Sequence, residues 1–84
     1  MASKPPDSVA QDNLGSLRLV RASYVATNID DTDTWDTKIK GIVDAWFGPS
    51  TTSGVVGVAI SGTTLTFAAS AANQVGTLYI LARS

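Results

Sequence analysis

The chain contains neither cysteine nor histidine in its 84 residues. Without cysteine it can form no disulfide bond and no thiolate metal site. Without histidine it lacks the commonest metal ligand and the commonest general base at neutral pH. A candidate nucleophile such as Ser61 therefore has no partner for a Ser-His triad. We expect a protein that is not an enzyme and that has no catalytic residues, no cofactor and no small-molecule substrate.

Basic clusters and long apolar runs are scarce as well. The formal net charge is −1, and the six basic residues are spread along the chain, so no basic stripe indicates a nucleic-acid partner. Residues 1–16 lack the apolar run of a secretory signal, and no apolar run approaches the length of a membrane span. We expect a soluble protein that is made in the cytoplasm of a cell and binds neither nucleic acid nor a membrane.

The length of the chain allows one domain only. A domain of this size buries about 60–65% of the surface that its unfolded chain exposes, so its margin of stability is small. Small folds gain support from disulfides, metals or oligomerisation, and disulfides are excluded here. We therefore predict a symmetric homo-oligomer.

What the chain does contain favours pleated sheet, because Val, Ile and Thr outnumber Leu, Lys, Gln and Arg. Residues 17–27 and 77–83 are predicted to form the first and last strands, with a helix as the competing interpretation for 17–27, because its alternation is not clean. One face of the first strand carries Val20, Ala22 and Tyr24, and one face of the last carries Leu78, Ile80 and Ala82. Tyr79 and Leu81 lie on the opposite face of the last strand, and apolar residues on both faces indicate a strand that is covered on both sides.

Residues 39–47 are predicted to form another strand. One side carries Val43, Ala45 and Phe47 and is expected to face inward, so that Ile42, Asp44 and Trp46 face outward. The reverse assignment, which places Trp46 in the core, stays open. A helix is the competing interpretation, because the apolar residues also form a stripe at helical spacing. Gly41 weakens a helix, and Gly48-Pro49 would end either element.

Residues 54–68 show the clearest local signal, a hairpin with a tight turn at Ser61-Gly62. Five apolar residues alternate along its two strands, namely Val56, Val58, Ile60, Leu65 and Phe67. A loop at Ser61-Gly62 pairs Val58 with Leu65, whereas a loop at Gly62-Thr63 pairs Ile60 with Leu65. Both registers keep the five side chains on one face, so the choice of register stays open. A short polar connection is expected at residues 69–76.

The predicted fold is all-β, a small antiparallel β-sandwich or barrel of about five to six short strands. Residues 17–84 would form its single domain, preceded by an extended N-terminal arm at residues 1–16. Pro5 and Pro6 hold this arm extended. It is either a disordered terminus or an arm that orders only against a neighbouring subunit. Deleting residues 2–14 should then leave the fold intact.

The stretch NIDDTDTWDT at residues 28–37 holds four of the seven acidic residues. A calcium loop that starts at Asp31 would need glycine where Asp36 stands and glutamate where Ile42 stands, so the EF-hand pattern fails. Clustered aspartates in a solvent-facing turn should stay ionised, which argues against acid-base catalysis. The favoured interpretation is a polar turn in which Trp35 covers the edge of the core, and no metal site is predicted, although a weak calcium site stays possible.

Apolar residues that face away from the core, together with residues of the extended N-terminal arm, indicate an interface with another chain. The residues expected there are Pro5, Pro6, Val9, Leu14, Ile42, Trp46, Tyr79 and Leu81. Trp46 and Tyr79 suit a subunit contact, where aromatic residues are enriched, and they could equally stack on sugar rings.

Residues 17–83 resemble small phage virion proteins that are encoded close to major capsid genes. The matching features are the first strand, the D-x-D-T-W turn at residues 31–35 and the strand at 42–47. They continue with the Pro-Ser-Thr-Thr turn at 49–52, the V-x-I-S-G-T-x-L-T-F hairpin at 58–67 and the closing L-Y-I-L-A strand.

The resemblance implies a capsid decoration or cement protein, a multi-copy structural component on the surface of the virion. Its partner would be the major capsid protein. It implies a β-sandwich or barrel without enzyme activity that assembles as trimers or other symmetric clusters, so that a trimer is the favoured homo-oligomer. It carries no functional residues over to this chain. A receptor- or carbohydrate-binding module of a phage tail fibre is the alternative.

Overall fold

The structure is a computed structural model that describes residues 3–49, 56–70 and 74–83. Its described residues form seven strands. In chain order these are β1 (Ser8–Leu14), β2 (Leu17–Ile29), β3 (Thr34–Asp36), β4 (Ile42–Pro49), β5 (Val56–Ser61), β6 (Thr64–Ala69) and β7 (Gln74–Arg83). The described residues contain no helix with the length and apolar character needed to cross a membrane.

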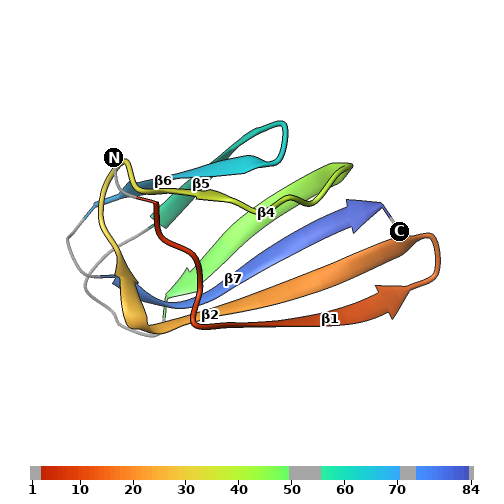
Figure 1. The fold of residues 1–84 in the computed structure, drawn as a ribbon, viewed down its shortest axis with the longest axis horizontal. Helices are drawn as coiled ribbons and strands as arrows, with labels where there is room; N and C mark the ends of the chain where they lie inside the picture. The colour runs from red at the N-terminus through yellow and green to blue at the C-terminus, as the bar shows by residue number, and fades with distance from the viewer. Residues whose placement is uncertain (1–2, 50–55, 71–73, 84) are drawn as a thin grey trace.

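The strands form two antiparallel sheets that enclose one core (Figure 1). The larger sheet has the order β1-β2-β7-β4 and the smaller one the order β3-β6-β5. The predicted all-β class is therefore confirmed, and of the two forms that the sequence left open the fold is the sandwich. The seven strands exceed the expected five to six because β1 and β3 were not predicted as strands.

The core lies between β2, β4 and β7 of the larger sheet and β5 and β6 of the smaller one. Of the two faces of β2 and β7, those that carry Tyr24 and Leu78 are buried, and these two side chains are fully enclosed. Tyr24 makes edge-to-face contacts with Phe47 and Phe67, at ring-centroid distances of 6.2 and 6.0 Å. Such aromatic contacts add to the stabilisation that the buried area provides.

Strand β4 corrects part of the prediction for residues 39–47. It is a strand and not a helix, and it begins at Ile42. Ala45 and Phe47 point inward as predicted, but Val43 is 50% exposed. The register with β7 shifts between Ile42 and Asp44, and such an irregularity breaks the strict alternation of faces.

The β5–β6 hairpin adopts the second of the two registers. Ile60 pairs with Leu65 and Ser61 pairs with Thr64, so the turn is Gly62-Thr63 and not Ser61-Gly62. Gly62 has a φ of +62°, a left-handed conformation that glycine adopts without steric cost. The predicted turn at residues 49–52 lies outside the described residues except for Pro49, which ends β4, and the predicted 69–76 connection already contains the start of β7 at Gln74.

The segment predicted to be an arm is part of the domain. β1 pairs with β2 along its whole length, from Ser8 opposite Ser23 to Leu14 opposite Leu17. A two-residue turn with Gly15 at a φ of +68° connects them. Residue 16 is therefore no domain boundary, and this segment orders against its own chain without a neighbouring subunit. Its seven strand residues are all exposed, which explains why they show no pattern of core residues.

Candidate functional site

Two aromatic rings stack on the outer face of the four-stranded sheet. Trp46 of β4 lies opposite Tyr79 of β7, and their rings have centroids 5.6 Å apart and an interplanar angle of 17°. Trp46 is 43% exposed, as expected for a side chain that points away from the core. Leu81 follows on the same face of β7, opposite Asp44. We call Trp46, Tyr79 and Leu81 the aromatic face.

A hollow of about 500 Å³ adjoins Tyr79 on the same side of the sheet. Its lining includes the hydroxyl residues Ser8, Ser23 and Thr77, which the strand registers place in one row. The next row holds Ala10, Arg21 and Tyr79. In these two rows only Arg21 and Tyr79 have large side chains, so a shallow space remains above the sheet. This space offers hydroxyl groups, a guanidinium and one aromatic ring.

The other residues predicted for an interface do not join the aromatic face. Ile42 was expected to point outward beside Trp46, but it is half-buried and packs against the core, because the register shift at the start of β4 reorients it. Val9 and Leu14 are exposed on β1. Pro5 and Pro6 lie in the segment before β1, with Pro5 exposed and Pro6 half-buried.

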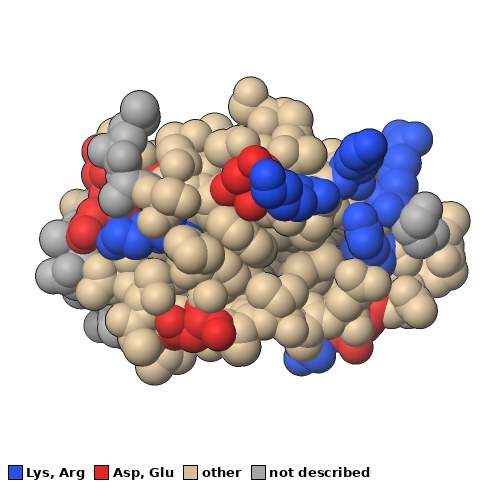
Figure 2. All heavy atoms as spheres, viewed as in Figure 1, with Lys and Arg blue, Asp and Glu red and all other residues tan. Residues whose placement is uncertain are grey.

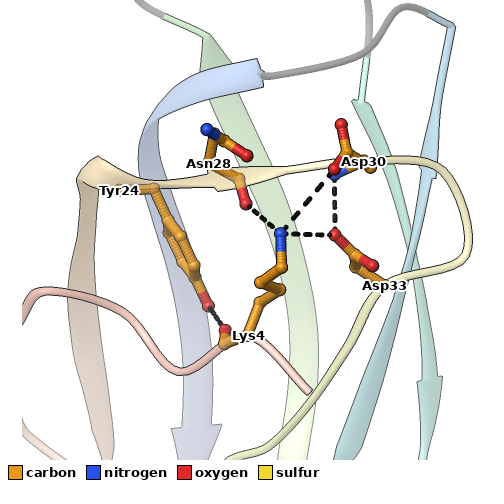
Figure 3. Close-up of polar contacts among 5 residues, drawn as sticks. All are labelled: Lys4, Tyr24, Asn28, Asp30 and Asp33. Atoms are coloured by element: carbon orange, nitrogen blue, oxygen red, sulfur yellow. Dashed lines mark hydrogen bonds and ion pairs between the residues drawn. The ribbon is translucent and has the colours of Figure 1, made fainter. Parts of the chain in front are cut away.

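The acidic stretch contains a buried carboxylate that the sequence did not reveal. The side chain of Asp33 is only 6% exposed, and its Oδ2 lies 3.1 Å from the ammonium of Lys4 (Figure 3). The same oxygen accepts a hydrogen bond of 2.8 Å from the backbone N–H of Asp30. Lys4 also donates to the carbonyl of Asn28 at 2.9 Å and lies 3.7 Å from the carboxylate of Asp30.

The remaining aspartates of this stretch point elsewhere. Asp31 accepts a hydrogen bond from the backbone N–H of Ala69 at 3.1 Å. Asp36 accepts one from the hydroxyl of Thr63 at 2.7 Å, and this bond is the main cause that lowers the pKa of Asp36 below its ordinary value. Within the described residues no three acidic side chains gather where they could hold a metal ion. The carboxylates instead tie the turn to the β5–β6 hairpin and to the N-terminus.

Trp35 is half-buried and packs against the core from β3, the position predicted for it. The structure therefore supports the interpretation of this stretch as a polar turn and adds a short strand to it. The absence of a metal stays a prediction, as does the absence of enzyme activity.

Residues 3–7 form a segment that we call the N-terminal latch, because it bonds to both sheets. Ser3 forms a parallel bridge with Thr34 of β3, and the N–H of Lys4 donates to the carbonyl of Thr34 at 2.7 Å. At its other end, the N–H of Asp7 donates to the carbonyl of Ser23 in β2 at 2.8 Å. Figure 1 shows this part of the chain crossing from the smaller sheet to the larger one.

Tyr24 joins the latch to the core. Its buried hydroxyl donates a hydrogen bond of 2.7 Å to the carbonyl of Lys4 (Figure 3). Burial is the main cause that raises the pKa of Tyr24, and the nearby charge of Asp7 raises it further. The hydroxyl therefore keeps its proton and remains a donor. No pattern in the sequence indicated this contact, because Lys4 and Tyr24 lie 20 residues apart.

Asp7 caps an irregular part of β2. Its carboxylate accepts hydrogen bonds from three consecutive N–H groups, those of Val25 and Ala26 at 2.7 Å and that of Thr27 at 3.0 Å. The bond from Val25 is the main cause that lowers the pKa of Asp7 from 3.8 to about 2. The charged carboxylate is therefore favoured in the folded chain relative to the unfolded one.

The low pKa of Asp7 predicts a loss of stability in acid. Because the folded pKa lies below the unfolded one, the contribution of Asp7 is present above about pH 4 and disappears as the pH falls towards about 2. The melting temperature of the protein should fall through this window, and the fall should be smaller in Asp7→Asn. Thermal unfolding followed by circular dichroism at stepwise pH tests this. Parallel curves for the two proteins would contradict it.

Charge on the molecular surface is divided into small groups. On the face that Figure 2 presents, several basic side chains lie close together at the right, and acidic side chains lie next to basic ones in several places. Arg21 pairs with Asp12 at 3.2 Å, and Lys38 pairs with Asp36 at 3.5 Å. This distribution leaves the aromatic face and the adjoining hollow as the candidate site. Comparisons of the chain with protein-family models, with curated proteins and with solved structures found no match.

Proposed function

We propose that this chain is a structural protein of a phage particle that binds the outer capsid shell and stabilises it. Its partner is the major capsid protein, and its place is the surface of the virion. The observation that carries the proposal is the stacked Trp46–Tyr79 pair on the open face of the larger sheet. The resemblance of residues 17–83 to small virion proteins directs the proposal to a capsid.

Attachment through the aromatic face follows from the chemistry of these side chains. Interfaces between proteins draw most of their affinity from a few aromatic anchors that become desolvated in the complex. Trp46 and Tyr79 already hold each other in a stacked arrangement, so little conformational freedom remains to be lost on binding. Leu81 extends the apolar surface along β7, and Asp44 opposite it can orient the contact.

Binding to shells assembled from the major capsid protein of the same phage tests the proposal. Trp46→Ala should weaken binding by about 30-fold, which corresponds to about 2 kcal/mol for the loss of an anchor. The variant should stay folded, because Trp46 is largely outside the core. Co-sedimentation at graded concentrations of the protein gives the affinities.

Ile60→Ala is the matched control. Ile60 is also exposed and apolar, but it lies at the turn end of β5 in the other sheet. This variant should bind shells as the unmodified chain does. Equal binding by Trp46→Ala and Ile60→Ala would contradict attachment through the aromatic face.

The hollow beside Tyr79 favours a second candidate function, a receptor- or carbohydrate-binding module of a phage tail fibre. An aromatic ring next to hydroxyl groups and the guanidinium of Arg21 offers a sugar both an apolar surface and hydrogen-bonding partners. If shells fail to bind while added sugars change the tryptophan fluorescence of the unmodified chain but not of Trp46→Ala, this second function holds and the first is wrong.

A further inference from the structure

Strand β1 forms an open edge of the larger sheet. In the order β1-β2-β7-β4 it has a single neighbour among the described strands. Its sequence, SVAQDNL, contains one charged residue and none of the lysines or prolines that protect many edge strands. A regular, exposed edge of seven residues is a template for pairing with another strand.

The alternation of the β1–β2 ladder determines which residues of β1 offer their backbone groups. Leu14 and Leu17 flank the two-residue turn, and the residues that flank such a turn bond to each other. Residues 10 and 12 of β1 therefore also direct their N–H and C=O groups to β2. Val9, Gln11 and Asn13 direct theirs to the open edge.

We propose that two copies of this chain pair β1 with β1 in antiparallel register about a two-fold axis at Gln11. This register places the three edge-directed residues opposite one another, with Gln11 facing Gln11 of the second copy and Val9 facing Asn13 of the second copy. Their backbone groups then form the hydrogen-bonded pairs of a regular antiparallel ladder. The two larger sheets become one continuous sheet with a symmetric interface.

The charges on β1 and β2 are complementary in this register. Ala10 of one copy faces Asp12 of the other, and Ala10 is the direct neighbour of Arg21 on β2. Each Asp12 therefore lies near the Arg21 of the second copy, with only the small side chain of Ala10 between them. It also keeps its pair with the Arg21 of its own chain. The two Asp12 carboxylates do not face each other, so the pairing brings no like charges together.

The hollow on the outer face fits the same arrangement. Leu14 is 51% exposed and lies on the same side of β1 as Ala10 and Asp12. In the dimer it faces Ser8 of the second copy, which begins the row that continues through Ser23 to Thr77. The exposed leucine of each copy therefore covers the hollow of the other, and an apolar side chain loses its contact with water.

The dimer does not depend on the proposed function, because it uses the edge of the sheet and not the aromatic face. A two-fold axis perpendicular to the sheet keeps both aromatic faces on the same side. If the proposed function is correct, each dimer binds the shell through two sites, and the linked sites bind more tightly than either alone. Shell binding and dimer formation can fail separately, so their tests are distinguishable.

Single cysteines test the register directly, because the chain has no cysteine of its own. Gln11→Cys should give a disulfide-linked dimer under mild oxidation, since the two Gln11 positions face each other within disulfide reach. Asn13→Cys alone should cross-link at least tenfold more slowly, because it faces Val9, and Val9→Cys combined with Asn13→Cys should restore cross-linking. Ala68→Cys is the control. Residue 68 is exposed on β6, away from the proposed contact, so its rate of cross-linking gives the rate of random collisions.

Light scattering coupled to size exclusion checks the association without a cross-link. The unmodified chain should form a dimer that dissociates on dilution, and Gln11→Pro should weaken the dimer at least tenfold, because proline removes an N–H that β2 does not use. Gln11→Ala should behave as the unmodified chain. Cross-linking of Gln11→Cys at the rate of Ala68→Cys would overturn the proposal, as would a monomer or a trimer at every concentration.

Discussion

A chain that lacks residues 2–14 should lose its cooperative fold. The deletion removes Lys4 from the buried carboxylate of Asp33 and the carbonyl of Lys4 from the hydroxyl of Tyr24. Breaking a buried ion pair costs about 3–5 kcal/mol, and a buried donor without its acceptor costs about 1–3 kcal/mol. Together these losses approach the whole stability of a small domain, which is about 5 kcal/mol.

Loss of β1 adds to this effect, because it uncovers one side of β2 along seven residue pairs. Urea unfolding followed by far-ultraviolet circular dichroism measures the outcome, and we expect a broad or absent transition. The control is the double variant Val9→Ser and Leu14→Ser, which keeps the latch and the backbone of β1. Both side chains are exposed, so the control should unfold within about 0.5 kcal/mol of the unmodified chain.

A truncated chain that unfolds like the full-length protein would show that the segment is only a frayed terminus. The sequence favoured that outcome, because residues 1–16 carry few core-forming side chains. The structure predicts the opposite, because the backbone of the segment and the side chains of Lys4 and Asp7, rather than apolar burial, hold it in place.

Lys4→Met should lower the free energy of unfolding by about 3 kcal/mol. The substitution keeps much of the length of the side chain but removes the charge that faces Asp33 at 3.1 Å and the hydrogen bond to the carbonyl of Asn28. The carboxylate of Asp33 is then buried without its cation. Urea unfolding at neutral pH gives the change in free energy.

Lys38→Met is the matched control for this prediction. Lys38 also pairs with an aspartate, Asp36, but both side chains of that pair are exposed, and exposed pairs contribute about 0–1 kcal/mol. Adding Asp33→Asn to Lys4→Met should recover part of the loss, because a neutral amide is less costly to bury than an unpaired carboxylate. Equal and small effects of the two lysine substitutions would mean that the latch does not stabilise the fold.

The contacts of the N-terminal latch are of a kind that sequence patterns do not predict. Lys4, Asp7 and Asp33 are charged residues in polar surroundings, and no periodicity connects them. Lys4 and Asp7 bond to backbone groups of β2 more than fifteen residues along the chain, and Asp33 pairs with the side chain of Lys4. A pattern of side chains along one segment contains no information about such partners. The buried role of Asp33 therefore could not be separated from the exposed roles of its neighbours.

The position of β1 at the edge of the sheet also kept it from being predicted as a strand. A strand that is buried on one face shows alternation of apolar and polar residues, but every residue of β1 is exposed. Its sequence therefore resembles a polar terminus. Position in the sheet, and not residue type, makes it a strand, because β2 supplies the hydrogen-bonding partners.

The sequence by itself determined the all-β class and which residues of β2 and β7 share a face, and it favoured an outward position for Trp46 without excluding a place in the core. These features follow from period-two burial, which residue types record directly. Tertiary structure decided the register of the β5–β6 hairpin, the irregularity at the start of β4 and the attachment of residues 3–14. Each of these depends on which backbone groups bond across the chain, and the residue types of one segment do not record those bonds. For the β5–β6 hairpin, both registers bury the same side chains.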